Sequence, residues 1–507
     1  MKAITSIIIL SLVFLGSSFA QNITNTLGST GIFTIKDGVN SYFSLSQSNG
    51  NVSLFRNMEL GGVGTSTSSR GVVTKNGIRF VHNFGTENLF IGLNSGNFTL
   101  TGYNNTGYGT NTLTLNTTGY LNAAFGVNSL SSNTTGFQNT ALGTETLKSN
   151  TTGYNNTSVG CLTLSKNTTG NSNSAFGNGS LYNNTTGSEN SAFGNRSLSF
   201  NQTGFGNSAF GSSSLLSNTS GSYNASFGNL SLYNNTTGGS NSVFGYSAMN
   251  NNSSGNYNSA FGTSSLYWST SGSNNCSFGY SSLFYNDYGN GNTALGTRSM
   301  ENNYSGSNNT AVGYLSGNTI SSGSNLTLIG YNSQPTSGTA TNQITLGNNS
   351  VTSLRCNVTS ITSLSDKRDK KNISDLQPGL DFVCELKPRQ FNWDKREWYE
   401  NNTSDGSKTE EIKTAGFIAQ ELDEVQTTHN AEWLNLVLKD NPEKWEATYG
   451  NLLPVMVKAI QELKAENDKL KSEIDSMKTI EERLAKLEDL ITDQNKLKEV
   501  KLTDKQQ

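Results

Sequence analysis

The 507-residue sequence is poor in the side chains that build most metal and catalytic sites. It contains only two histidines and four cysteines, namely His82, His429, Cys161, Cys276, Cys356 and Cys384. Neither histidine has ligand-like spacing to Cys or Asp, so we expect no metal, no cofactor and no histidine-based catalysis. The cysteines are too few and too scattered for a disulfide framework, and buried free thiols are the favoured interpretation.

Charge is also scarce. Charged residues make up 14% of the chain and hydrophobic residues 33%, both low for a globular enzyme, and the net charge is only −3. No stripe of Lys and Arg runs through the first two thirds, which gives no reason to expect nucleic-acid binding. The charge is concentrated after about residue 350, where the composition changes.

Long apolar runs are confined to the N-terminus. Residues 1–20 combine Lys2, an apolar core from Ile7 to Leu15, and a small-residue cleavage site at Ala20. This pattern predicts a secretory signal peptide and therefore an exported, secreted or cell-surface protein. A membrane anchor is the competing interpretation, but the run is short for a bilayer. No other segment has the length and hydrophobicity of a transmembrane helix.

What the sequence does contain is a repeat. Glycine recurs every 17 residues from Gly92 to Gly347, sixteen times without an insertion or deletion. An apolar or aromatic residue precedes each glycine, and Leu or Met follows four residues later twelve times in succession. A second glycine keeps the same step from Gly102 to Gly323. A fixed period of this kind predicts a stacked architecture and outweighs local propensity.

Each unit is predicted to form two short strands joined by tight turns, because runs such as Asn-Ser-Ala-Phe-Gly are surrounded by Asn, Ser, Thr and Gly. Two glycines per unit oppose a helix. Sixteen rungs would reach roughly 75 Å at about 4.8 Å per rung. Each unit offers two or three apolar side chains, including the residue before the glycine, and association of several chains would cover such a thin core. The predicted fold class is mainly β: a long parallel β-roll or β-solenoid at residues 91–348.

The Asn-Ser-Ala-Phe-Gly unit followed by a Ser-Leu step resembles the head repeats of trimeric adhesins, which wind as a β-roll. This resemblance implies a homotrimer. Residues 21–90 lack the 17-residue step, but Gly31–Ile35 and Tyr42–Ser46 have strand-like patterns. We predict an N-terminal β region that caps or attaches the stack.

Asn-x-Ser/Thr sequons recur in the repeats, for example at Asn116, Asn133 and Asn150. In a eukaryotic secreted protein they would be glycan acceptors. The favoured interpretation is that Asn and Thr are the turn chemistry of the repeat, stacked as hydrogen-bonded ladders.

Four sequence blocks follow the repeats: Ser365–Ile373, Leu386–Trp393, Ala415–Leu422 and Tyr449–Pro454, the last running into Val457–Leu463. In this order they resemble the C-terminal intramolecular chaperone of phage tail spikes, endosialidases and related fibres. The resemblance implies a small α+β domain at residues 349–450. It also implies that this domain trimerises the chain, helps the upstream β-fibre to fold and then cuts itself off.

The family's nucleophile is the serine that opens Ser-Asp-x-x-x-Lys, with the lysine five residues later as its partner. Both match here, at Ser365 and Lys370, so the implied scissile bond is Leu364–Ser365. The resemblance thus implies an autoproteolytic serine peptidase that acts only on itself. A lysine can accept the hydroxyl proton once burial or neighbouring cations lower its pKa.

The candidate neighbouring cations are Lys367, Arg368 and Lys371. Asp366 either orients the site or forms a turn, and the sequence leaves both interpretations open.

Residues 451–507 carry apolar side chains at alternating steps of three and four, including Ile460, Leu463, Leu470 and Ile474. Asn467 occupies one core position, where it could set the register. The step slips between Met477 and Ile480 and then resumes. We predict a C-terminal coiled coil; a helix packed on a domain is the alternative.

Taken together, these patterns predict a secreted or cell-surface trimeric fibre, adhesin-like, with a self-releasing chaperone. A prophage-type tail fibre, or a glycan-binding fibre with a non-cleaving chaperone, is the alternative. An enzyme acting on an external substrate is disfavoured because the repeats hold almost no Asp, Glu or His. A cell-surface or glycan ligand is a candidate partner, although Trp268 stands alone and no second aromatic column is expected.

Overall fold

The computed structural model describes residues 32–36, 41–46, 52–54, 72–355, 357 and 365–503. The predicted signal peptide and Leu364 lie outside the described residues. The chain divides into two compact units, residues 1–172 and 173–507. Among the described helices, none combines the length and the apolar composition needed to cross a membrane.

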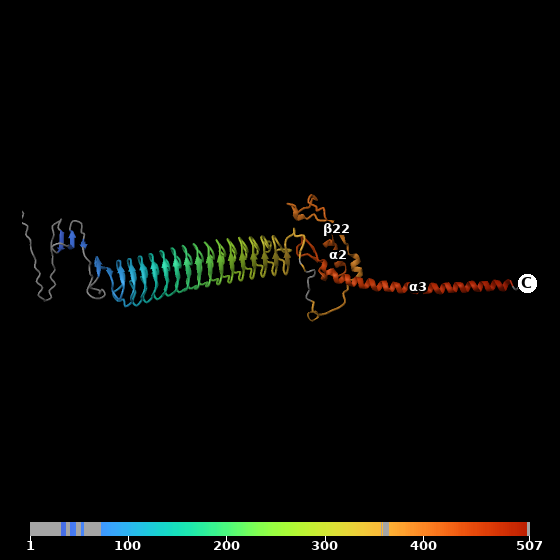
Figure 1. Ribbon diagram of the computed structural model, residues 1–507, viewed down its shortest axis with the longest axis horizontal. Helices are drawn as coiled ribbons and strands as arrows, with labels where there is room; N and C mark the ends of the chain where they lie inside the picture. Colours follow the sequence, from blue (N-terminus) through green and yellow to red (C-terminus); the bar gives the residue numbers. More distant parts are fainter. Residues whose placement is uncertain are drawn as a thin grey trace, which may run out of the picture. The chain divides into compact units, whose positions relative to one another are not determined.

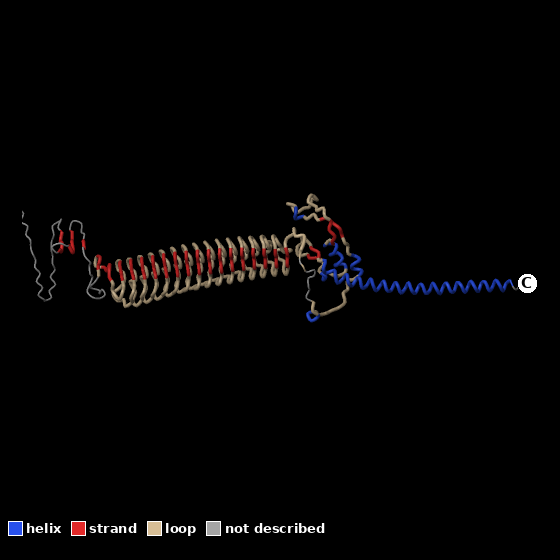
Figure 2. The backbone as a smooth tube through the Cα atoms, in the orientation of Figure 1, coloured by secondary structure: helices blue, strands red, loops and turns tan. Residues whose placement is uncertain are grey.

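The 17-residue repeats form a parallel β-solenoid with one three-residue strand per repeat (Figures 1 and 2). Neighbouring strands pair in register 17 residues apart, so that Ala124, for example, lies opposite Ala141. This confirms the predicted fold class. The solenoid strands of the first unit are β6 (Leu89–Ile91), β7 (Thr106–Tyr108), β8 (Ala123–Phe125), β9 (Thr140–Leu142) and β10 (Thr157–Val159).

The second unit continues the pattern with β11 (Ser174–Phe176), β12 (Ser191–Phe193), β13 (Ser208–Phe210), β14 (Ala225–Phe227), β15 (Ser242–Phe244), β16 (Ser259–Phe261), β17 (Cys276–Phe278), β18 (Thr293–Leu295), β19 (Thr310–Val312), β20 (Thr327–Ile329) and β21 (Ile344–Leu346). Each of these strands pairs in parallel with the next.

The prediction of two strands per unit is wrong, and the reason is backbone conformation. After each strand from β7 to β19 two residues adopt left-handed φ values, as at Asn128 (57°) and Leu130 (49°). Left-handed residues cannot extend a strand. The turn nevertheless keeps its inter-rung hydrogen bonds, because Leu130 N still donates to Thr146 O at 3.1 Å.

Close contact between rungs explains the glycine period. Gly126 has a φ of +126°, and a Cβ there would lie 2.4 Å from Gly143 O of the next rung. At the second glycine column, a Cβ on Gly136 would lie 2.3 Å from Asn133 Oδ1 and 2.4 Å from Gly153 O. Any other residue would therefore push the rungs apart.

The interior is narrow. In β8 the middle residue, Ala124, is fully buried, and so is Leu130, four residues after the glycine. The twelve Leu and Met residues in Leu130's position all have φ between 48° and 54° and are all fully buried. A left-handed residue costs about 1–2 kcal/mol, and complete burial of a leucine stabilises by about 1.5–3 kcal/mol. Burial thus offsets the backbone strain.

The residue before the glycine does not belong to this interior, contrary to the prediction. Phe125 is 38% exposed, because alternate residues of a strand face opposite sides and the small Ala124 takes the inward position. A second aromatic column also exists, against expectation: Tyr103, Tyr120, Phe137 and Tyr154 stack at 4.8–5.1 Å between ring centroids.

Two columns of asparagine and a column of Ser and Thr, such as Ser129, fill the rest of the interior. Asn122 Nδ2 donates to Asn105 Oδ1 of the preceding rung at 3.1 Å and to Gly136 O at 2.9 Å. In a second ladder Asn133 Nδ2 donates to Asn116 Oδ1 at 2.8 Å and to Gly136 O. The ladder interpretation is confirmed. The sequon residues Asn116 and Asn133 are buried and hydrogen-bonded, so they cannot accept a glycan in the folded solenoid.

The N-terminal strands are antiparallel. β1 (Ile32–Lys36), β2 (Ser41–Ser46) and β3 (Val52–Leu54) form one small sheet, which confirms strands at both predicted segments. β4 (Val73–Lys75) and β5 (Ile78–His82) form a hairpin, and β5 pairs with β6, the first strand of the solenoid.

The cysteine prediction is wrong in part. The described thiols of Cys161, Cys276 and Cys384 are free, as predicted, but Cys161 and Cys384 are exposed and Cys276 is only half-buried. Cys356 lies outside the described residues. Trp268 is not isolated either, because its ring packs edge-on against Tyr267 at 5.4 Å.

One rung breaks the second asparagine ladder, and this generates a prediction. Ser269 stands where neighbouring rungs have Asn, and Asn252 Oδ1 and Ser269 Oγ are buried without a hydrogen-bond partner. Ser269→Asn should supply the missing donor and stabilise these rungs by about 1–2 kcal/mol, the scale of an unsatisfied buried group. Thermal unfolding and amide hydrogen exchange measure the effect. Asn218→Ser, which opens the same gap in an intact stretch, should destabilise the solenoid by a similar amount. A change of the same sign in both variants, or no change in either, would contradict the ladder.

A second prediction concerns His82, which is buried between Phe90 and Phe98. Its Nε2 bonds Ser95 O at 2.7 Å, and burial lowers its pKa. Because the folded pKa is below the unfolded value, the stability it contributes is complete above about pH 6.5 and is lost as the pH falls further. Protection factors of the first rungs should therefore drop between about pH 7 and pH 5. His82→Gln should remove this dependence, whereas His429→Gln should retain it.

Candidate functional site

The last part of the second unit is a small α+β domain followed by a long helix, α3 (Leu452–Thr503) (Figure 1). Its core contains Phe382, Leu422, Leu436 and Val455. The elements are η1 (Lys367–Asp369), α1 (Leu380–Glu385), β22 (Arg389–Asn392), η2 (Arg396–Trp398), β23 (Lys413–Gly416), α2 (Ala419–Thr428), η3 (Glu432–Leu434), β24 (Val437–Leu438), β25 (Glu446–Ala447) and η4 (Tyr449–Asn451).

The structure brings three of the sequence blocks together. β22, from the second block, pairs antiparallel with β23, from the third. Arg389 of β22 also forms a bidentate ion pair with Glu421 of α2, with a shortest distance of 2.5 Å, which lowers the pKa of the Glu421 carboxyl. The fourth block joins them because Tyr449 Oη accepts a hydrogen bond from Phe417 N at 3.1 Å. The blocks are therefore parts of one packed unit.

The first turns of α3 belong to this packed unit. Leu452 and Val455 are buried in the domain core, and Glu462 Oε2 accepts a hydrogen bond from Leu380 N, at the start of α1, at 2.6 Å. That bond lowers the pKa of Glu462. Sequence reasoning missed Glu462, because no local pattern links two residues 82 positions apart.

From Ile460 onwards the apolar side of α3 is uncovered. The side chains of Ile460, Leu463, Leu470 and Ile474 are all exposed. The helix predicted for residues 451–507 is confirmed over Leu452–Thr503. Its pairing with other helices stays a prediction.

Ser365 and Lys370 lie next to each other. Lys370 Nζ donates a hydrogen bond to Ser365 Oγ, and both residues are exposed. The turn between them, η1, curls the chain so that residues five positions apart can meet. A serine hydroxyl held by a lysine nitrogen is the arrangement that a Ser–Lys nucleophile needs, provided that the lysine loses its proton.

Asp366 has the turn-forming role. Its carboxylate accepts a hydrogen bond from Arg368 N at 2.8 Å and so caps η1. It also pairs with the Arg368 guanidinium at 2.6 Å, which lowers the pKa of Asp366 and raises that of Arg368. Because this pair compensates the Arg368 charge, Arg368 is a poor candidate for depressing the pKa of a nearby lysine.

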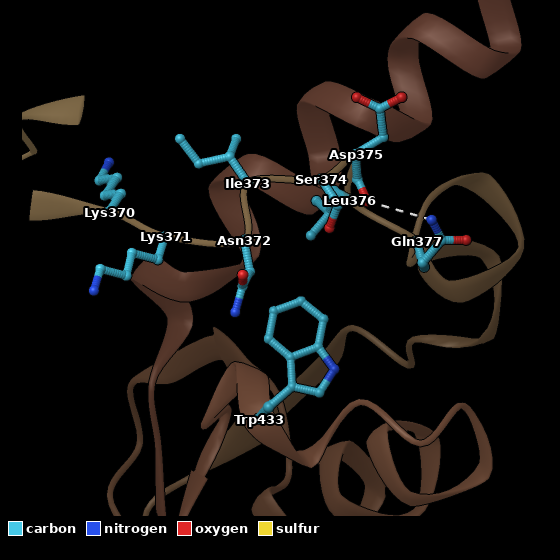
Figure 3. A pocket seen from close by; sticks show the side chains of 9 residues that line it. All are labelled: Lys370, Lys371, Asn372, Ile373, Ser374, Asp375, Leu376, Gln377 and Trp433. Carbon is cyan, nitrogen blue, oxygen red and sulfur yellow. Dashed lines mark hydrogen bonds between the residues drawn. The ribbon is translucent and has the colours of Figure 1, made fainter. Parts of the chain in front are cut away.

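A shallow groove begins at Lys370. It is lined by residues 370–377 and by Trp433, and Figure 3 shows this segment running past the indole ring. Asn372 has a left-handed φ of 53°, which turns the chain there. No sequence pattern pointed to Trp433, because it follows α2 in the sequence and only the fold brings it to residues 370–377.

Comparison with known protein families identifies this region. Residues 365–430 match the family described as Chaperone of endosialidase. The C-terminal part of the chain carries a chaperone-of-endosialidase domain. The match begins at Ser365 and covers three of the four blocks, and the fourth packs against them as described above. A comparison with curated proteins gives no match.

The contact between the chaperone domain and α3 generates a prediction. A Cβ on Gly379 would lie 2.1 Å from Glu462 Oε2 and would displace the carboxylate from Leu380 N. Gly379→Ala should therefore lower the melting temperature of the C-terminal domain by about 3–5 °C. Gly450→Ala is the matched control, because a Cβ there meets nothing within 4 Å. Equal melting temperatures for the two variants would show that the Glu462 contact contributes nothing.

Proposed function

We propose that this protein is a secreted or cell-surface fibre of three identical chains. In this proposal the C-terminal domain assembles the chains, assists folding of the solenoid and then cleaves itself off before Ser365. The observation that carries the proposal is the chaperone-of-endosialidase domain directly behind a long β-solenoid. Such a combination fits a tail-fibre or adhesin-like protein.

The solenoid has a folding problem that an assembly domain would solve. Its rungs are nearly identical, so chains that associate side by side can shift by 17 residues at little energetic cost. Parallel β-structures also fold slowly and expose aggregation-prone intermediates. A coiled coil formed by α3 would align the chains first, because its register is set by its own apolar steps and by Asn467. The exposed apolar side of α3 supports this role.

The hydrogen bond between Lys370 and Ser365 supports the proposed cleavage. The Ser365 hydroxyl attacks the carbonyl carbon of residue 364, and neutral Lys370 takes the hydroxyl proton. The peptide C–N bond breaks, the Ser365 nitrogen leaves as an amine after gaining a proton, and water hydrolyses the resulting ester. The Ser365 hydroxyl and the peptide bond that it attacks belong to the same chain and are adjacent in it. The nucleophile is therefore positioned intramolecularly, and one turnover is sufficient.

Lys370 is exposed in the single chain, so this chemistry requires further desolvation of the lysine. Contact with other copies of the domain would provide it and would delay cleavage until the chains have assembled. Once the fibre has formed it is kinetically trapped, and loss of the aligning part makes folding irreversible. Export is supported by the pattern of residues 1–20.

Ser365→Ala removes the proposed nucleophile and should leave a single full-length band on a denaturing gel, where the natural chain gives two. Lys370→Met should have the same effect because it removes the base. Ser363→Ala is the matched control and should still be cut. Intact-mass measurement of the secreted protein locates the new N-terminus at Ser365 and reports removal of residues 1–20.

If the Ser365→Ala variant still gave two fragments, Ser365 could not be the nucleophile. A single uncut band from the natural chain would mean that the domain acts only in assembly. Native mass spectrometry of the same sample tests the number of chains independently of cleavage.

A further inference from the structure

In residues 173–347 the strands present two outward columns. Each strand turns its middle residue inward and its first and third residues outward, as in β13, where Ala209 is buried between Ser208 and Phe210. The third residues form what we call the outer column, the eleven residues at the 17-residue step from Phe176 to Leu346. The first residues form a flanking column, mostly Ser and Thr, from Ser174 to Ile344.

The outer column is apolar at every rung. Its first seven members are phenylalanines that stack at 4.6–4.8 Å between ring centroids, with planes within 10° of parallel. Stacking covers the ring faces and leaves the outer edges in contact with water, so that Phe244 is 38% exposed and Leu295 51%. Eleven rungs at about 4.8 Å make a strip about 48 Å long.

This apolar strip is contiguous over eleven rungs and is rimmed by the mostly polar flanking column, and an exposed apolar patch with a polar rim is typical of an interaction site. It is also uncharged. Residues 173–347 contain only five charged side chains, and all of them lie in turns: Glu189, Arg196, Asp287, Arg298 and Glu301. The strand face can therefore be removed from water without leaving a charge unpaired.

Three observations identify the occupant. The outer column is one residue wide and repeats at the rung spacing. A partner that contacts every rung of it must carry apolar residues at the same spacing, as a solenoid of the same period does. The absence of charge on the face offers nothing to a partner selected by charge complementarity. The exposed apolar side of α3 in the same chain suits a parallel coiled coil, which would bring identical strand faces together in the same direction.

We infer that the outer column is the surface through which the solenoids of neighbouring copies of this chain contact each other. The Phe edges point towards a common axis, the flanking Ser and Thr column lies beside them, and the turns with the charged residues face away. Because the outer column is narrow, copies of the chain arranged around a rotation axis cover it completely when it faces that axis. This inference rests on the proposed self-association and adds which face of the solenoid mediates it.

Disulfide cross-linking of the full chain tests this geometry, because a disulfide forms only between Cα atoms within about 7 Å. The four native cysteines are first replaced by serine. Phe227→Cys then places a thiol in the outer column, and Tyr223→Cys places the matched control in a turn of the same repeat, where the tyrosine is 61% exposed. Ser242→Cys, in the flanking column, repeats the test without removing a stacked ring. Native mass spectrometry establishes the number of chains in each sample before oxidation.

After oxidation, Phe227→Cys and Ser242→Cys should give about tenfold more covalent dimer on a denaturing gel than Tyr223→Cys. A protein that is oligomeric by native mass but cross-links equally or better through Tyr223→Cys would overturn the inference while leaving the proposed association intact. A protein that is monomeric by native mass would overturn both.

Discussion

The structure depends on the short distance between successive rungs. Parallel strands hydrogen-bond at about 4.8 Å, and every column of the repeat must accept an identical neighbour at that distance. Glycine is required where backbones approach most closely, as at Gly126, since no side chain fits there. Asparagine is suited to the interior because its amide both donates and accepts, so that each residue satisfies the next one along the column. The strict 17-residue period is a consequence of this spacing.

The same constraint determines which apolar groups are inside. The interior has room for one small strand residue and one Leu or Met per rung, and the latter is held in a left-handed conformation that its burial offsets. Larger side chains such as Phe125 are turned outward. The solenoid therefore satisfies its polar interior within one chain and yet carries an apolar column on its strand face. These two features explain how a chain of low hydrophobic content can form an extended fold and still present a surface for the proposed association.

The C-terminal domain has the opposite character. It is charged and has a compact core. Its long-range contacts, such as Arg389 with Glu421 and Leu380 with Glu462, can form in only one arrangement of the chain. A repetitive solenoid lacks a unique register for association. In the proposed assembly, a domain with unique contacts and a helix with a single interrupted apolar side would supply one. The junction between these parts carries the Ser365–Lys370 pair, where cleavage would separate them after assembly.

The sequence by itself determined the repeat, its parallel stacking, the asparagine ladders and the identity of the C-terminal domain, because each depends on spacing along the chain or on local motifs. It also placed Ser365 and Lys370 within reach of each other, five residues apart across a turn capped by Asp366. Tertiary structure alone decided that each rung has one strand and that Phe125 and its equivalents face outward. It also decided that Glu462 bonds Leu380 and that Trp433 lines the groove beside residues 370–377. Those outcomes depend on how much room the solenoid interior has for side chains and on contacts between residues far apart in the sequence. A local sequence pattern encodes neither of these.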